Sequence, residues 1–503
     1  MLPSHHRERW LVVSLAVALT LLRSAVLVLF EGSKFDSDQA LIGLMAAHLV
    51  EGRALPIFTY GQPYMLGLEA WMAAPFFLVG GATVQMLKAP LLVVNIAIAV
   101  LLPLALERAC KLRPAAALLP ALFFVLAPPG TVGLFLEASG GNVEPFLYVV
   151  ILWISRRHPL VFGAVLAIGI LQREFTVYAL GGLAVLGLAD GSLFDRRQWR
   201  AVFQGGVAFA AVWQVVYLLK AFSNIDGPGT SVEFGALRPE SNVVALVSRT
   251  CFDASNLTSG LSLVVSSHLP DLLGLATRDM ESYGIISTLH QGPGWLGPML
   301  GVAFVLALGR VTWILLAGGL RPWQPPLRFA TYLFLVGAQS AAAYAVLRCG
   351  AIDIGTMRYS LLTLFGAVGL SALFLVVEPR RWVKATGAAV ILLWAGASLS
   401  DHLRLGSEYL FHRPANLRRV LADDLVRHGV RFAYADFWDA YSTVFLTGER
   451  VIVASTSVVF LREYQWLVDE RADEAVWIRR RQPCRGGRRV VEDTYVCPPI
   501  GTR

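Results

Sequence analysis

The chain has 503 residues, of which 56% are hydrophobic and only 16% are charged. This balance is typical of an integral membrane protein, and it excludes a large soluble enzyme or a nucleic-acid-binding protein. The formal net charge of +8 does not require an acidic partner, because Arg and Lys gather mainly in short loops between apolar runs.

Apolar runs predict about eleven membrane spans, several of them short for a bilayer crossing. They lie at about 10–30, 83–106, 114–128, 143–155, 159–172, 175–189, 200–221, 296–318, 328–347, 359–377 and 384–400. Alternate loops carry clusters of basic residues, which the positive-inside rule puts in the cytoplasm. The N-terminus is then cytoplasmic, as an uncleaved anchor, and an odd number of spans sends the C-terminus outside.

We therefore expect a transmembrane domain at 1–400 with two long outward segments, a first loop at 31–82 and a lid-like loop at 222–295. The tail at 401–503 has a different pattern. A helical period at 416–428 precedes two short strand patterns at 431–435 and 450–454, with a helix between them at 440–446. This order predicts a small extracytoplasmic α/β domain. Its two cysteines, Cys484 and Cys497, pair if the tail lies outside the cytoplasm and otherwise stay reduced.

Two acids, Asp36 and Asp38, open the first outward loop directly after the first span. Acids can flank a span without any function, but these two precede a helical pattern that ends at Gly52, where free backbone amides and the helix dipole stabilise carboxylates. A carboxylate there can act as a general base toward a hydroxyl, or hold a divalent cation such as Mg²⁺ or Mn²⁺. A second apolar, aromatic helix is expected at 65–77. Both helices are expected to lie on the membrane surface.

The first loop resembles that of the polytopic GT-C glycosyltransferases, and most closely their protein O-mannosyltransferase and aminoarabinose-transferase branch. The resemblance rests on Asp38-Gln39-Ala40, a helix ending at Gly52, and Tyr60-Gly61-Gln62-Pro63-Tyr64. Weaker similarities follow at Gly140-Gly141-Asn142-Val143-Glu144, at Gln172-Arg173-Glu174 and at Met357-Arg358-Tyr359-Ser360-Leu361-Leu362.

This resemblance implies a GT-C-like α-helical polytopic fold in a bacterial inner membrane and a polyprenyl-phosphate sugar as donor. It also implies that the family's catalytic carboxylate falls on Asp38, with Asp36 as the alternative. The family's Asp-Glu is Asp-Gln here, and Gly61-Gln62-Pro63-Tyr64 lacks the Lys that the aminoarabinose transferases carry near the lipid phosphate.

Charged residues at the outer ends of other predicted spans lie at the same membrane level as Asp36 and Asp38. An anionic lipid headgroup needs cations, and the guanidinium fork matches phosphate oxygens. Arg358 and Arg173 are therefore the predicted phosphate ligands, the alternative being ordinary interfacial arginines that snorkel to water. The predicted substrate-binding residues are Glu144, Glu174, Tyr60, Gln62, Tyr64 and Glu69, with a span cap as the alternative for Glu144 and membrane-interface anchors as the alternative for the tyrosines.

The resemblance, together with the charges at the outer span ends, implies an inverting glycosyltransferase that moves a sugar from its lipid carrier to an extracytoplasmic glycan, lipid or protein. A lipid-linked sugar flippase and a non-catalytic scaffold of the same fold are the alternatives. A transporter is expected to carry charge near the bilayer midplane or broken spans in repeated halves, whereas this chain gathers charge at one face and has no evident repeat. Metal-ligand spacing and nucleotide-binding loops are absent from the sequence.

Overall fold

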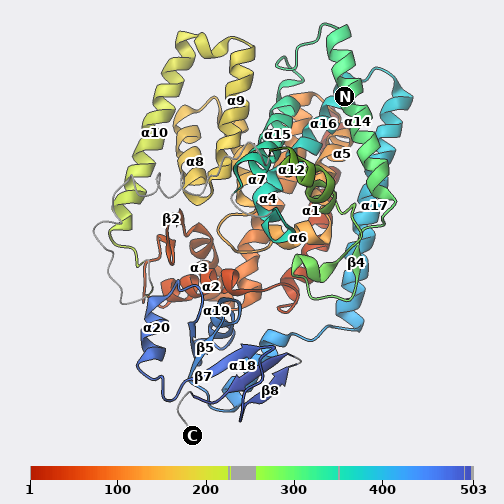
Figure 1. The fold of residues 1–503 in the computed structure, drawn as a ribbon. Helices are drawn as coiled ribbons and strands as arrows, with labels where there is room; N and C mark the ends of the chain where they lie inside the picture. The colour runs from red at the N-terminus through yellow and green to blue at the C-terminus, as the bar shows by residue number, and fades with distance from the viewer. Residues whose placement is uncertain (1, 225–226, 228–256, 349–351, 492, 500–503) are drawn as a thin grey trace.

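The computed structural model describes residues 2–224, 227, 257–348, 352–491 and 493–499. A bundle of long helices fills the upper part of the molecule, and the C-terminal domain lies below it (Figure 1). The first half of the predicted lid-like loop falls mostly outside the described residues. Its second half contains the short elements α12 (Leu257–Leu263), η5 (Val264–His268), α13 (Leu269–Leu272), β3 (Arg278–Asp279), η6 (Met280–Tyr283) and β4 (His290–Gln291).

Seven helices in the described part of the chain are long and apolar enough to cross a membrane. They are α1 (Leu2–Leu29), α4 (Val84–Cys110), α10 (Arg196–Lys220), α14 (Leu296–Ala317), α15 (Arg328–Leu347), η7 with α16 (Ile354–Thr363 and Leu364–Val377) and α17 (Arg381–Phe411). The predicted count of about eleven spans is not confirmed. Runs predicted as separate spans form the shorter helices α7 (Glu144–Ser155), α8 (Pro159–Gln172) and α9 (Val177–Ala189), the last entered through η1 (Glu174–Thr176) and followed by η2 (Ser192–Phe194).

One further apolar run forms a helix that breaks in its middle. Helices α5 (Pro114–Val125) and α6 (Pro129–Phe135) meet at an angle of 80°, because consecutive prolines at the break cannot continue the first helix. Three side chains bond the carbonyl groups left free there: buried Arg23 donates to Phe124 O at 2.5 Å, and Ser398 and His402 bond the Leu126 and Ala127 oxygens at 2.6 and 2.8 Å. The break directs the chain toward Glu137.

The first loop, at 31–82, forms the two helices that its sequence predicts, with a hairpin between them. Helix α2 (Ser37–Val50) begins at Asp36, whose side chain accepts from the Gln39 amide at 3.1 Å. Strands β1 (Phe58–Thr59) and β2 (Gln62–Leu66) pair around Gly61, and α3 (Leu68–Gly80) follows. Gly61 has a φ of +66°, a conformation that favours glycine.

The C-terminal domain is a five-stranded mixed sheet in the order β6-β5-β7-β9-β8. The predicted helix-strand-helix-strand order is confirmed by α18 (Leu417–Arg427), β5 (Phe432–Ala435), α19 (Phe437–Leu446) and β6 (Ile452–Ser455), of which the two strands are parallel. The chain then adds elements that the sequence pattern did not predict: α20 (Arg462–Asp469), β7 (Val476–Arg480), β8 (Arg488–Val491) and β9 (Thr494–Cys497). Cys484 and Cys497 form a disulfide.

A polar cluster docks this domain onto the first loop. His48, buried on α2, lies 3.0 Å from the Tyr60 hydroxyl and 3.2 Å from the Glu449 carboxylate. Tyr464 donates to the same carboxylate at 2.6 Å, and Arg53 pairs with its other oxygen. Burial raises the pKa of Glu449, but the hydrogen bonds from His48, Tyr464 and Arg53 outweigh burial and hold the pKa at about 2.

We expect Glu449→Ala to loosen the C-terminal domain, because it leaves His48 and Tyr464 without their common acceptor. The free energy of unfolding should fall by about 2–3 kcal/mol. The effect should be full at neutral pH and fade as the pH falls from about 4.5 toward 2, where the wild-type carboxylate itself protonates. Thermal unfolding and limited proteolysis of the purified protein measure this. Glu470→Ala, an exposed acid at the end of α20, is the control, and equal stability of both variants would contradict the docking role.

Candidate active site

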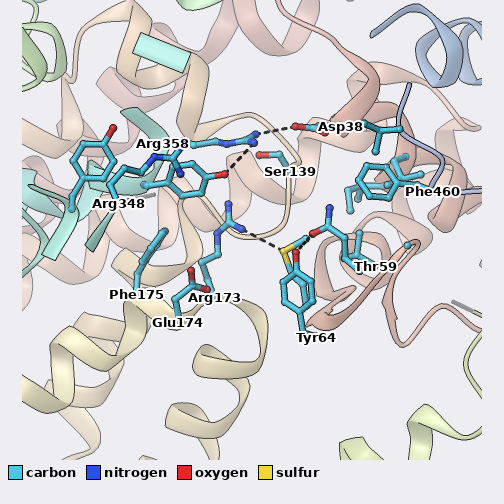
Figure 2. Close-up of a pocket in the computed structure, with 18 of the residues that line it drawn as sticks. Asp38, Thr59, Tyr64, Ser139, Arg173, Glu174, Phe175, Arg348, Arg358 and Phe460 are labelled. Atoms are coloured by element: carbon cyan, nitrogen blue, oxygen red, sulfur yellow. Dashed lines mark hydrogen bonds and ion pairs between the residues drawn. The ribbon is translucent and has the colours of Figure 1, made fainter. Parts of the chain in front are cut away.

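A cavity of about 940 Å³ lies between the first loop, the ends of several apolar helices and the C-terminal domain (Figure 2). Segments far apart in the sequence meet in its wall. The lining residues that carry polar or aromatic groups are Asp38, Thr59, Gln62, Tyr64, Ser139, Arg173, Glu174, Phe175, Tyr178, Tyr344, Arg348, Arg358, Tyr359, Phe437, Trp438, Ser457 and Phe460.

Asp38 and Arg358 are joined across this cavity. One guanidinium nitrogen of Arg358 lies 3.0 Å from the Asp38 carboxylate and 3.2 Å from that of Glu137. The other Glu137 oxygen accepts from Lys34 Nζ at 2.9 Å. Acidic and basic side chains therefore alternate in a row of ion pairs that runs from Lys34 through Glu137 and Arg358 to Asp38.

Glu137 is a buried residue of this row of ion pairs, with 5% of its surface exposed. Burial raises the pKa of Glu137, but the Lys34 and Arg358 charges outweigh burial and hold it at about 2. Glu137 is therefore a permanent anion that fixes both cations. Lys34 also donates to the Tyr283 carbonyl at 2.9 Å, and buried Lys88 donates to the carbonyls of Lys34 and Leu27. Lys88 thus holds the end of the first span against the start of the loop.

Three arginines surround the ring of Tyr359. The guanidinium carbons of Arg348, Arg358 and Arg173 lie 4.8, 5.4 and 5.5 Å from the ring centroid. Within the described residues, no carboxylate pairs with Arg173 or Arg348, and the Nε atoms of all three arginines are buried without a hydrogen-bond partner. Arg173 and Arg348 are thus cations without a carboxylate partner in the described part of the chain, held beside the paired Arg358. Such a cluster favours an anionic ligand that compensates their charge.

The structure brings five predicted site residues into the cavity wall besides Asp38. Arg358, Arg173, Glu174, Gln62 and Tyr64 all line it. Arg173 approaches from the end of α8, where its Nη1 lies 3.4 Å from the Met65 sulfur.

Four other predicted residues lie behind the wall. Glu69 is 2% exposed and accepts hydrogen bonds from the Gly140 and Gly141 amides, both at 2.7 Å. Glu144 is equally buried beside it, and Tyr60 belongs to the docking cluster around His48. Glu69 therefore holds the turn that carries Ser139 and does not itself reach the cavity. Ser139 lines the cavity.

Asp36, the alternative catalytic acid, is the fourth of these residues. Its carboxylate caps α2 and is absent from the cavity lining. Burial, together with the nearby charges of Glu137 and Asp38, raises the pKa of Asp36 to about 6. The geometry therefore separates the two acids: Asp38 faces the cavity, and Asp36 starts the helix that presents it.

The residues of this site that the sequence did not point to are Arg348, Lys34 and Phe460. Arg348 follows directly after the predicted span at 328–347, and Arg358 directly precedes the next one, so the position of Arg348 at a span end was the available signal. Lys34 lies two residues before Asp36.

In the tail, the stretch from Ala435 to Tyr441 places acids and aromatic residues after a strand pattern, which is typical of a sugar-binding loop, with a structural turn as the alternative. Phe437 and Trp438 of this stretch line the cavity.

The residues present do not assemble a metal site in the described part of the chain. No three His, Cys, Asp or Glu side chains converge there on a point that could hold a metal ion. Asp38 and Glu137 are each satisfied by a cation instead. The Mg²⁺ or Mn²⁺ ion considered from the sequence stays an untested prediction.

No protein-family model and no curated protein matches this chain. Among solved structures, the crystal structure of ArnT from Cupriavidus metallidurans bound to undecaprenyl phosphate is similar over 98% of each chain, with 10% identity and a TM-score of 0.60. The apo structure of the same ArnT is similar over 98% of each chain, with 11% identity and a TM-score of 0.58. The chain therefore has the fold of ArnT, an aminoarabinose transferase of the GT-C type, and the predicted GT-C-like polytopic fold is confirmed.

We expect Asp36→Asn to stabilise the protein increasingly as the pH rises. Asn caps a helix as well as Asp does, and the substitution removes a carboxyl that burial disfavours in its charged form. In the wild type the pKa of Asp36 rises from 3.8 to about 6 on folding, so stability falls as the pH rises from about 4 to 6 and stays lower above that.

The measurement is the thermal unfolding midpoint of both proteins between pH 4 and pH 8. The advantage of the variant should grow across the interval between pH 4 and 6 and then level off. Asp423→Asn, at an exposed acid on α18, is the control. If the stability advantage of Asp36→Asn shrank as the pH rose, burial would not raise the pKa of Asp36.

Proposed function

We propose that this chain is a membrane glycosyltransferase that moves a sugar from a polyprenyl-phosphate donor to an extracytoplasmic acceptor. The observation that carries the proposal is one cavity at the outer helix ends that holds a carboxylate, Asp38, beside arginines that lack carboxylate partners in the described residues. Acceptor activation and anionic leaving-group binding need these two kinds of group within one sugar's reach.

The arginines fit the phosphate of the donor. The cavity wall holds three guanidiniums, from Arg173, Arg348 and Arg358, and the two carboxylates of Asp38 and Glu174. Behind the wall, Lys34 balances the charge of Glu137, so one positive charge is left to match the single negative charge of a phosphodiester. The ArnT structure that was solved with undecaprenyl phosphate supports a carrier lipid of this class for the shared fold. These arginines replace the lysine that the first loop lacks.

The apolar part of the cavity fits the start of the polyprenyl chain. Val177 and Tyr178 on α9 and Ala343 and Leu347 on α15 line the cavity beside the arginines, and both helices are apolar segments of the membrane domain. A donor placed with its phosphate at Tyr359 and its lipid along α9 and α15 presents its sugar toward Asp38.

The reaction then follows as a direct displacement. Asp38 accepts the proton of the acceptor hydroxyl, whose oxygen attacks the anomeric carbon of the donor sugar. As that bond forms, the bond from the anomeric carbon to the phosphate oxygen breaks, and its electron pair stays on the phosphate. The second negative charge that develops there is stabilised by the arginines. Attack from the side opposite the phosphate inverts the anomeric configuration.

The membrane orientation follows from the same proposal. The cavity and the C-terminal domain lie outside the cytoplasm of an inner membrane, and the Cys484–Cys497 disulfide supports an oxidising compartment for that domain. The N-terminus is then cytoplasmic.

We expect Asp38→Asn to lower kcat by about 10²–10⁴-fold, the usual contribution of a general base, with folded protein and affinity for undecaprenyl phosphate retained. The assay is sugar transfer from a panel of radiolabelled undecaprenyl-phosphate sugars in membranes that express each variant. Asp36→Asn is the matched control and should keep its activity. Full activity of Asp38→Asn would remove this carboxylate from the chemistry. Donor translocation without transfer would instead favour a flippase.

We expect Arg348→Gln and Arg173→Gln each to weaken the binding of undecaprenyl phosphate by about 10–100-fold, because each removes charge-assisted hydrogen bonds to the phosphate. Binding is measured on the purified protein in nanodiscs. Arg321→Gln, at an exposed arginine before the opposite end of α15, is the control. Affinity unchanged in both variants would place the phosphate elsewhere.

A further inference from the structure

The C-terminal domain contributes an aromatic wall to the cavity. Phe437 and Trp438, at the start of α19, and Phe460, after β6, all line it. Trp438 keeps 49% of its surface exposed, although its neighbours on α19 are largely buried. A half-exposed indole inside a cavity is a large apolar surface that water contacts until a ligand covers it.

This wall is held rigid by its own contacts. The Phe437 ring lies edge-to-face against Trp438 and against Phe460, with centroids 5.0 and 5.6 Å apart. Asp436 accepts from the Trp438 amide at 3.1 Å and from the Ser457 hydroxyl at 3.0 Å. The ring surfaces are therefore positioned before any ligand arrives, which lowers the entropy cost of binding.

The hairpin of the first loop packs directly on this wall. A Cβ at Gly61 would lie 2.3 Å from the Phe460 ring, so only glycine allows this approach. The next residue, Gln62, lines the cavity, and its side-chain oxygen accepts from the Tyr64 hydroxyl at 2.8 Å. Its amide N–H groups have no partner among the described residues and remain available to a ligand.

The order of groups across the cavity decides which substrate the wall faces. Figure 2 shows Arg348, Arg358, Asp38 and Phe460 in sequence from one side to the other. In a direct displacement the acceptor approaches from the side opposite the leaving phosphate. With the phosphate at the arginines, the acceptor lies beyond Asp38, against the aromatic wall. The carrier lipid lies at the other end, along α9 and α15.

We propose that Trp438, Phe460 and Gln62 form the acceptor subsite, and that the acceptor is a carbohydrate whose sugar ring carries the attacking hydroxyl. This inference rests on the proposed function and names its acceptor class. The C–H groups on one face of a sugar ring carry slight positive charge and pack on the negative face of an indole. The hydroxyl groups at the edge of the sugar ring accept hydrogen bonds from the side-chain amide of Gln62. The pairing of a flat aromatic surface with a single amide favours a sugar over an extended peptide, which would need a row of backbone partners.

The test uses the full chain in nanodiscs and a panel of allyl glycosides of common hexoses and hexosamines as soluble acceptors. Transfer kinetics are measured with the undecaprenyl-phosphate sugar that is active in the membrane assay. Glycoside binding is measured separately, without donor, by saturation-transfer NMR in the Asp38→Asn background. The variants are Trp438→Ala, Trp438→Phe and Gln62→Ala, with Trp466→Ala as the control, an exposed tryptophan on α20 that is not part of the cavity wall.

We expect Trp438→Ala to raise KM for the glycoside by about tenfold or more, with the affinity for undecaprenyl phosphate unchanged. Trp438→Phe should recover part of the loss, and Trp466→Ala should behave as wild type. Because Trp438 is half exposed, its variants should keep the wild-type unfolding midpoint, which is measured alongside.

Three outcomes would overturn the inference: an unchanged KM in Trp438→Ala, a loss confined to donor binding, or a Ser/Thr peptide serving as acceptor while no glycoside in the panel binds or accepts sugar. Glycoside binding that depends on Trp438 without transfer to any acceptor would leave the subsite intact and overturn the proposed glycosyltransferase reaction instead. The two proposals therefore fail in different ways.

Discussion

The site depends on one buried carboxylate that two cations share. Glu137 bonds Lys34 from the first loop and Arg358 from the start of the last-but-one long helix. A charge at this depth is tolerated only when it is compensated, so the ion pairs require the ends of three remote segments to meet at one point. The break between α5 and α6 contributes to this arrangement, because it directs the chain to Glu137. Arg23, Ser398 and His402 stabilise the break by bonding its carbonyl groups.

This compensation divides the charges of the cavity into two classes. Glu137 and Lys34 are buried and satisfied, so they position their neighbours. Arg173 and Arg348 stay without a carboxylate partner in the described residues and face the cavity. Asp38 lies at the boundary, tied to Arg358 yet part of the cavity wall. A cavity that keeps uncompensated cations beside the Asp38 carboxylate is organised for an anionic ligand and a proton transfer, which is the basis of the proposed glycosyl transfer.

The C-terminal domain completes this cavity instead of standing apart from it. It docks through the His48 and Glu449 cluster at one end of α2, while Asp38 lies at the other end of the same helix. Helix α19 packs closely on α2 as well, where a Cβ at Gly43 would lie 2.5 Å from the Phe445 ring. The docking therefore sets the distance between Asp38 and the aromatic wall, and it makes the soluble domain part of the proposed acceptor site.

The sequence by itself determined the membrane character, the two helices of the first loop and the α/β pattern at 416–454. It also identified Asp38, Arg173 and Arg358 as candidate site residues. Each of these depends on local signals: apolar run length, helical period, or a charge next to a span end. Only the tertiary structure separated Asp36 from Asp38, placed Glu69 and Glu144 behind the wall, and added Arg348 and Phe460 to it. It also left the count of about eleven spans unconfirmed, because short apolar runs form helices of similar composition whether or not they cross the bilayer. These outcomes depend on which residues distant in sequence become neighbours, and periodicity along one segment carries no information about its partners.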